Sequence, residues 1–165
     1  MPEGTAVGVV RNNDINNLVV VGADKEMASI IAGIPGHDIE NVRLNNIRIV
    51  ANGGGTKDQA VIVPDENVKR YPDPKNFGII PAYGFFCRHV KSIEFHNINL
   101  AFATEDQRPA FVLDQVAGAD FDFIKAQRAE GGLPSFQLRA VEKFSLRNSP
   151  ELEPKSGNFA EATRF

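Results

Sequence analysis

The sequence predicts an all-β protein, a parallel β-helix in which the chain winds around its core in stacked turns. Three observations lead to this prediction. One spacing of apolar residues occurs in both segments 39–49 and 90–100. Weaker copies return at intervals of about 25 residues, and repeats of 20–50 residues are typical of solenoids. Asn or Gly stands near the point where the spacing breaks. The 165 residues suit a single domain.

The two clearest copies define the repeating unit. Both carry apolar residues at relative positions 0, 3, 5, 8 and 10 and Asn at position 7, starting from Ile39 and from Val90. Positions 3 and 5 alternate as in a strand, but the step from 5 to 8 breaks the alternation. A short corner is therefore predicted at positions 6 and 7, where Asn46 and Asn97 fall. Asn tolerates the left-handed backbone that such a corner needs.

Weaker copies start at Ile15, Val116 and Val141, with Gly22 and Asn148 at the corners and Phe123 interrupting the Asn column. The five starts are separated by 24, 51, 26 and 25 residues. Because 51 is about twice the other values, one further unit is predicted between residues 39 and 90, which gives about five to six turns. The last three copies share an apolar block that begins at Phe85, Phe111 and Phe136, five residues before each start.

The repeat also sets the predicted organisation of the chain. The β-helix domain spans residues 1–152, with a loop excursion at 53–83 that holds four prolines. A loop of that length is usually functional or disordered. The tail, 153–165, shows no period, and either covers the last turn or frays.

Two other folds could produce repeats of this kind. A sandwich of short antiparallel strands also has closely spaced strands, but Asn52-Gly53 is the only hairpin-type pair in the chain. Leucine-rich repeats have a similar period, but their Leu pattern is absent.

Composition excludes several classes of function. The net charge of -3 argues against a nucleic-acid partner, and no apolar run is long enough for a membrane helix. Cys87 is the only cysteine, which excludes an internal disulfide and a Cys-rich zinc site. The spacing of the three histidines predicts no metal site, and Gly53-Gly54-Gly55 lacks the setting of a dinucleotide site, so no cofactor is expected.

Several segments resemble a known family. These are Gly33-Ile34-Pro35-Gly36-His37-Asp38-Ile39-Glu40-Asn41-Val42, Asn46-Ile47-Arg48-Ile49 with the following three glycines, Pro81-Ala82-Tyr83-Gly84-Phe85, Cys87-Arg88-His89-Val90 and Asp106-Gln107-Arg108-Pro109-Ala110. Together they resemble the late turns of glycoside hydrolase family 28, the polygalacturonase-like enzymes of the pectin-lyase-like superfamily. The resemblance extends from about residue 14 to residue 152.

The resemblance implies a right-handed parallel β-helix and inverting hydrolysis of galacturonic-acid linkages by clustered carboxylates. The family carries this chemistry in Asn-Thr-Asp, Asp-Asp, Gly-His-Gly and Arg-Ile-Lys motifs, and none of them occurs here. Gly36-His37-Asp38 and Arg48-Ile49-Val50 each depart from the nearest motif. No catalytic residue is therefore assigned, and the chain is expected to be the C-terminal part of a longer enzyme, truncated at its N-terminal end.

Two functional hypotheses follow. The first is the C-terminal part of a pectin-degrading hydrolase that alone has little or no activity. The alternative is a non-catalytic β-helix that binds acidic polysaccharide or acts as a scaffold. Both name an acidic plant-type polysaccharide, galacturonan or rhamnogalacturonan, as partner. The open N-terminal end is expected to self-associate, because a β-helix cut across a turn exposes strand edges. The family suggests a secreted or periplasmic location, although the chain shows no signal peptide.

Six residues are candidates for substrate binding: His37, Tyr83, Arg88, His89, Asp106 and Arg108. An Arg suits a uronate carboxylate, and a Tyr, such as Tyr83 or Tyr71, can stack on a sugar ring. Each also has a structural interpretation. His37 can sit in a turn and bond to backbone, Arg88 can pair with Asp114, and Asp106 with Arg108 can brace a turn. Asp24, Asp38, Asp106 and Asp114 are the carboxylates considered, and no pattern joins them.

Overall fold

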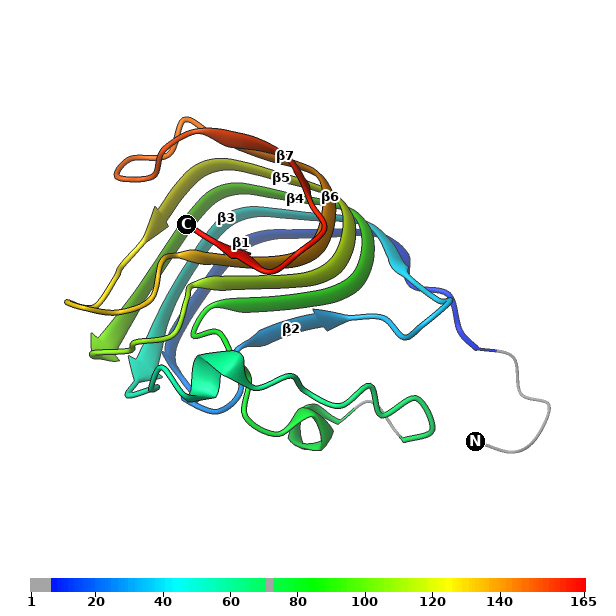
Figure 1. Cartoon of the computed structure of the whole chain (residues 1–165), viewed down its shortest axis with the longest axis horizontal. Coiled ribbons are helices and arrows are strands. Elements are labelled where there is room, and N and C mark those ends of the chain that lie inside the picture. The colour runs from blue at the N-terminus through cyan, green and yellow to red at the C-terminus, as the bar shows by residue number, and fades with distance from the viewer. Residues whose placement is uncertain (1–6, 71–72) are drawn as a thin grey trace.

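The computed structural model describes residues 7–70 and 73–165 and is all-β, with a sheet dominated by parallel strands (Figure 1). Its elements are β1 (Arg11–Ala23), β2 (Ser29–Ala32), β3 (Ile39–Gly53), the 3₁₀ turns η1 (Gln59–Val61) and η2 (Pro74–Phe77), β4 (Phe85–Thr104), β5 (Phe111–Ala126), β6 (Phe136–Arg147), β7 (Lys155–Phe159) and β8 (Thr163–Arg164). The long strands are bent into nested arcs around the core.

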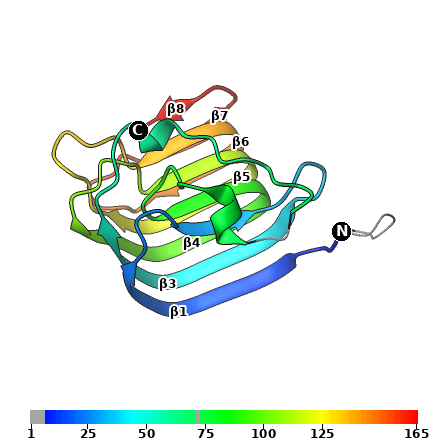
Figure 2. The same cartoon turned by 90° about the horizontal axis from the view of Figure 1, so that it is seen from below.

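The sheet follows the order β1-β3-β4-β5-β6-β7, and every pair from β1 to β6 is parallel. Ile39 pairs with Val90, Val90 with Val116, and Val116 with Val141. The four copies that start at these residues are therefore stacked in the predicted register. An antiparallel sandwich is excluded for this part of the chain. Figure 2 shows the same strands as successive layers, with β1 at one end.

Two parts of the predicted repeat are wrong. Ile15 pairs with Leu44 rather than with Ile39, and Asn17, not Gly22, occupies the corner beside Asn46. The partners of β1 and β3 are 29 residues apart over most of their length, because the connection between them contains β2; a fixed period of about 25 misplaced this copy. The unit expected between residues 39 and 90 is also missing, since β3 pairs directly with β4.

Left-handed residues form three columns, one at each bend of the strands. The predicted column contains Asn17, Asn46, Asn97, Phe123 and Asn148, all with φ between 48° and 58°. A second column contains Asn12, Asn41, Ser92, Gly118 and Lys143, and a third contains His89, Gln115 and Ala140. Each bend thus falls at one relative position in successive strands. Only the Asn-rich column was predicted, because the other two have mixed composition.

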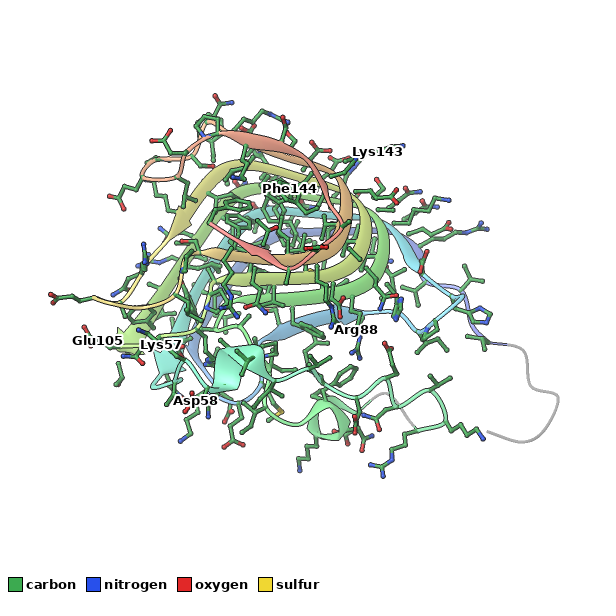
Figure 3. The ribbon with its side chains drawn as sticks, viewed as in Figure 1. Lys57, Asp58, Arg88, Glu105, Lys143 and Phe144 are labelled. Carbon is green, nitrogen blue, oxygen red and sulfur yellow. The ribbon has the colours of Figure 1, made fainter. Side chains whose placement is uncertain are left out.

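Two ladders of aromatic rings fill the inside of the arcs. Phe85, Phe111, Phe136 and Phe165 stack with centroids 4.9–5.7 Å apart and planes within 15° of parallel. Phe95, Phe121 and Phe144 form the second ladder, and Phe95 and Phe121 are 4.7 Å apart. Figure 3 shows Phe144 on the concave side and its neighbour Lys143 pointing away from it. The alternation of the strands therefore separates core from solvent at these positions.

The segment between β3 and β4 lies against the outside of the stack (Figure 2). It contains η1 and η2 and closes a second apolar cluster of Ile80, Ala82, Phe86 and Val112. Phe85 points into the main core while Phe86 points into this second cluster. The excursion predicted at residues 53–83 is thus packed on the sheet by the outward side chains of β4 and β5.

The C-terminal tail covers β6, the last long strand of the stack. β7 and β8 both pair antiparallel with β6, and Phe165 stacks on Phe136 at 5.4 Å. Lys155 places its ammonium group 4.6 Å from the centre of the Phe165 ring. One end of the stack is therefore closed by the chain itself.

Candidate functional site

The structure separates the six candidate residues into two groups. His37, Arg88 and His89 lie where β2, the start of β4 and the excursion meet, beside two open hollows. Tyr83, Asp106 and Arg108 are buried around the base of the excursion. The two groups have different surroundings: His37 and His89 of the first group each line a hollow, whereas no residue of the second group lines either one.

Arg88 is almost fully buried, at 1 % exposed, and its side chain points into the excursion (Figure 3). Its terminal nitrogens donate to the backbone carbonyls of Pro64 and Asp65, and its Nε lies 3.5 Å from a carboxylate oxygen of Glu66. The expected alternative partner, Asp114, instead forms an ion pair with Arg139, whose hydrogen bond to Asp114 raises the pKa of Arg139. The guanidinium group of Arg88 thus holds the excursion and presents no free face to a ligand.

His89 is the residue that links the excursion to the open surface. It stands in the third corner column with φ of 50° and is 5 % exposed. Its Nε2 lies 3.1 Å from both carboxylate oxygens of Glu66. A carboxylate on one ring nitrogen fixes the orientation of an imidazole. Glu66 therefore positions His89 at the edge of the second hollow.

His37 closes a tight turn between β2 and β3. Its backbone N–H donates to Ile34 at 2.9 Å and its carbonyl accepts from Ile34 at 3.3 Å, which agrees with the expectation of a turn histidine. The side chain is exposed and lines a hollow of about 190 Å³ together with Asp38, Glu66 and Phe77. The imidazole is thus available to a ligand even though the backbone of the residue is structural.

The second hollow lies on the other side of the same turn. It measures about 430 Å³ and is lined by Pro35, Gly36, Asp38, His89 and Glu142, among others. Asp38 lines both hollows, so the Ile34–His37 turn separates two parts of one surface. Carboxylates and imidazoles from the β2–β3 turn, the excursion, β4 and β6 line the two hollows with apolar neighbours, which is the mixed lining typical of a ligand site.

Asp106 and Arg108 form a buried clamp at the base of the excursion. The carboxylate accepts from Arg108 at 2.7 and 2.9 Å and from the backbone N–H of Gly55 at 3.0 Å, while Arg108 also donates to the carbonyl of Ile80. Tyr83 donates to the carbonyl of Gln127 at 2.6 Å and is 4 % exposed. Burial, and secondarily the charge of Asp106, raises the pKa of the Tyr83 hydroxyl. Asp106 and Arg108 connect segments of the protein, in line with the bracing interpretation, and Tyr83 also joins two segments through its bond to Gln127. Tyr71 lies outside the described residues.

The four carboxylates considered earlier are not brought together as a group. Asp106 and Asp114 are each paired with an arginine, and Asp24 accepts from the backbone N–H of Glu26. Only Asp38 lines the hollows. Within residues 7–70 and 73–165, no three His, Cys, Asp or Glu side chains gather in a way that could hold a metal ion. In the same ranges no helix has the length and apolar character needed to cross a membrane.

Sequence reasoning missed two acidic residues at the site. Glu66 lies in the excursion, where no period predicts which residue returns to the stack. Glu142 follows Val141 and is stacked in register with Ala117, so its place could be inferred from the repeat once the register is known. The sequence repeat could therefore have placed Glu142 at the site, but no sequence pattern could have placed Glu66 there.

Comparison of the chain with protein-family models, with curated proteins and with solved structures finds no match. The resemblance to glycoside hydrolase family 28 therefore stays a prediction.

Proposed function

We propose that the chain is the C-terminal part of a right-handed parallel β-helix that binds acidic polysaccharide, and belongs to a pectin-degrading hydrolase whose catalytic carboxylates lie elsewhere in the enzyme. The surface formed by the two hollows beside the Ile34–His37 turn would hold part of the glycan. The observation that carries the proposal is the in-register parallel stack, which brings His37, Asp38 and His89 to one open surface.

The arrangement suits a glycan because sugars offer both hydroxyl groups and apolar ring faces. His37 and Asp38 supply a nitrogen and carboxylate oxygens for hydrogen bonds to hydroxyls, and Phe77 supplies an apolar wall in the first hollow. His89, oriented by Glu66, stands at the second hollow. Hydrolysis by inversion requires two carboxyl groups placed across a scissile bond. Asp106 and Asp114 are unsuited to that role because each is held by an arginine.

That same observation favours the second candidate function, a non-catalytic module that binds acidic glycan. Both candidates predict binding by the isolated chain without hydrolysis. They differ in whether the chain works beside a catalytic β-helix. Activity recovered on adding a catalytic N-terminal partner would favour the enzyme, and its lack would favour the module.

Retardation of the purified chain in native gels that contain polygalacturonic acid, or rhamnogalacturonan, tests the binding. We expect retardation without release of reducing ends. His37→Ala should weaken binding by about 3- to 10-fold, the value of one net hydrogen bond. His96→Ala is the matched control, because His96 is a half-exposed histidine paired with Asp122 and lines neither hollow.

Three results would count against the proposal. Release of reducing ends above a heat-inactivated control would mean that the catalytic groups are present in this chain. Equal loss of binding in both histidine variants, or no retardation by either glycan, would remove the assigned surface.

A further inference from the structure

β1 forms the open end of the stack. It pairs with β3 on one side, and no described residue pairs with its other edge (Figure 2). Its inward positions include Ile15, Leu18 and Val20, which match the buried Leu44, Ile47 and Ile49 of β3. Ile15 and Leu18 are nevertheless 41 % and 42 % exposed, because no layer covers them. An unpaired, apolar edge of this length is a site for strand addition.

The hydrogen bonds between stacked Asn side chains show which groups a strand added to the edge of β1 would meet. Asn41 donates through its Nδ2 to Asn12 Oδ1, Asn46 donates to Asn17 Oδ1, and Asn97 donates to Asn46 Oδ1, at 2.7–3.0 Å. Asn148 donates in the same direction, to Asp122 Oδ1. Each corner amide thus uses its N–H toward the layer before it.

In the described part of the chain, the side-chain nitrogens of Asn12 and Asn17 have no hydrogen-bond partner. Because the Oδ1 of each amide accepts from β3, we infer that the nitrogen lies on the opposite side, toward the position that a preceding layer would occupy. Two donors five residues apart, at two successive bends, therefore point out of the open end. A partner that satisfies them needs a hydrogen-bond acceptor at each of its own two bends.

A second copy of β1 has amide oxygens at its own two bends but cannot keep the alternation of inward and outward side chains when it pairs with β1. Inward residues lie two positions apart within a straight segment but three apart across a corner, as Ile15 and Leu18 do. Two copies related by a twofold axis would pair antiparallel. Setting Asn12 of one copy against Asn17 of the other then places Ile15 opposite the outward Asp14 of its partner. Opposite residues in a ladder point to the same face of the sheet. Every antiparallel pairing that matches the corners would therefore place inward residues of one copy opposite outward residues of the other.

The other end of the stack offers no parallel edge to a second copy either, because β7 and β8 cover β6. The expected self-association through the open end stays a prediction. The spacing of inward residues in β1 restricts it to contact between apolar side chains, without a continuous backbone hydrogen-bond ladder between the two copies. A strand that runs parallel to β1 can align its bends with those of β1 and also its inward residues with the inward residues of β1.

We propose that the free edge of β1 binds a β-helix coil that precedes it in the stack, runs parallel to it in register, and carries Asn or Asp at the two corners facing Asn12 and Asn17. The proposal rests on the part of the proposed function that makes this chain the later portion of a longer β-helix, and it does not depend on glycan binding. It specifies the direction, the register and two side chains of the partner.

A coil taken from the protein itself provides the probe. A copy of residues 111–135 is placed directly before residue 5, where it replaces residues 1–4. Val10 then follows Val116 of the copy by 25 positions, which is the spacing of Val116 and Val141. Gly118→Asp and Phe123→Asp in the copy give it corner residues whose side chains only accept. The readout is hydrogen exchange of the β1 amides by mass spectrometry. We expect exchange at least ten times slower than in the chain without the added coil.

Two matched variants separate the proposal from simple burial. Asn12→Asp with Asn17→Asp keeps the acceptors used by Asn41 and Asn46 but removes both free donors. It should leave the chain without the coil nearly unchanged and reduce the protection gained from the coil at least threefold. In the second variant, deletion of Asp120 from the copy shifts its inward residues by one position and should abolish the protection.

Three results would overturn the proposal. These are equal protection by the shifted coil, equal protection in the doubly substituted chain, and β1 amides that are already protected in a dimer of the chain without the coil.

Discussion

The corners of the stack depend on single residues in the left-handed region. For most residue types this conformation costs roughly 1–2 kcal/mol, and Asn is among the few that adopt it readily. Four members of the predicted column are Asn, and the fifth is Phe123, with φ of 54° and half of its surface exposed. Phe123 contacts the ring of His96 edge-on at 5.6 Å but leaves a gap in the amide ladder. The residue therefore carries a backbone cost without the hydrogen bonds of its neighbours.

Phe123→Asn should stabilise the protein by about 1–2 kcal/mol, because Asn accepts the left-handed backbone and can join Asn97 to the next layer. Urea unfolding measures the change. Phe123→Leu is the control, since it removes the ring but keeps the unfavourable backbone, and it should bring no gain. If both variants gave the same stability, the corner cost would not be the reason.

Two buried hydroxyl and thiol groups predict how stability depends on pH. Burial raises the pKa of the Cys87 thiol above its ordinary 9.0 and that of Tyr83 above 10.0. When the folded-state pKa of a group is raised, the group contributes fully to the free energy of unfolding at pH values below its ordinary pKa. Above that pKa the contribution decreases, because the unfolded chain releases the proton first. The free energy of unfolding should therefore fall as the pH rises above about 9.

Urea midpoints at pH 8, 9.5 and 10.5 test this dependence. Cys87→Ala should show a smaller decrease across that range than the parent chain, since one of the two groups is removed. An identical decrease in both proteins would assign the alkaline loss to other groups.

At the scale of elements, the strands stack through their inward side chains. Phe121 is fully buried and contacts rings of both aromatic ladders, at 4.7 Å from Phe95 and 5.0 Å from Phe136. Phe121→Ala should destabilise the protein by about 3–5 kcal/mol through lost burial and a remaining cavity. Phe123→Ala, two residues away on the exposed side, should change stability by less than about 1 kcal/mol. Thermal or urea unfolding of the pair checks whether the core follows this alternation.

The excursion is joined to the stack by the clamp of Asp106 and Arg108. Removing one partner of a buried ion pair typically costs about 3–5 kcal/mol. Asp106→Ala should therefore destabilise the protein and make residues 56–70 sensitive to limited proteolysis. The double variant Asp106→Ala with Arg108→Met should recover part of the loss, because no unpaired charge stays buried. Greater proteolysis in the double variant than in the single one would show that the charge pair itself is the anchor.

The elements divide clearly into those the sequence could predict and those it could not. The stacked strands from Ile39, Val90, Val116 and Val141 were predicted because each repeats one spacing with a fixed inward face. β1 was shifted in register because the loop that precedes β3 lengthens that turn. Glu66 was missed because the excursion has no period and reaches its position only through its contacts with Arg88 and His89. Local patterns determine the stack, whereas long-range packing determines the site.

For the whole molecule, the two ends of the stack differ. β6 is covered by β7, β8 and the ring of Phe165, while β1 keeps a free edge and exposed apolar side chains. The candidate site lies between them, at the turn joining β2 to β3, where hollows have formed beside a bend of the stack. The molecule therefore combines a closed end, an open end and one surface rich in imidazole and carboxylate groups.

The spacing of the paired strands also determines the order in which they can meet during folding. Neighbours among β4, β5 and β6 join residues 25 or 26 apart, whereas β3 and β4 join residues 51 apart. Doubling a loop adds only about 0.6 kcal/mol of closure entropy, but the excursion must also become ordered before β3 can dock. We expect the nucleus to form at β4–β6, with β3 and then β1 added later. In the reverse direction, β1 should be the first strand to open, and the unfolding of this protein should begin at its N-terminal layer.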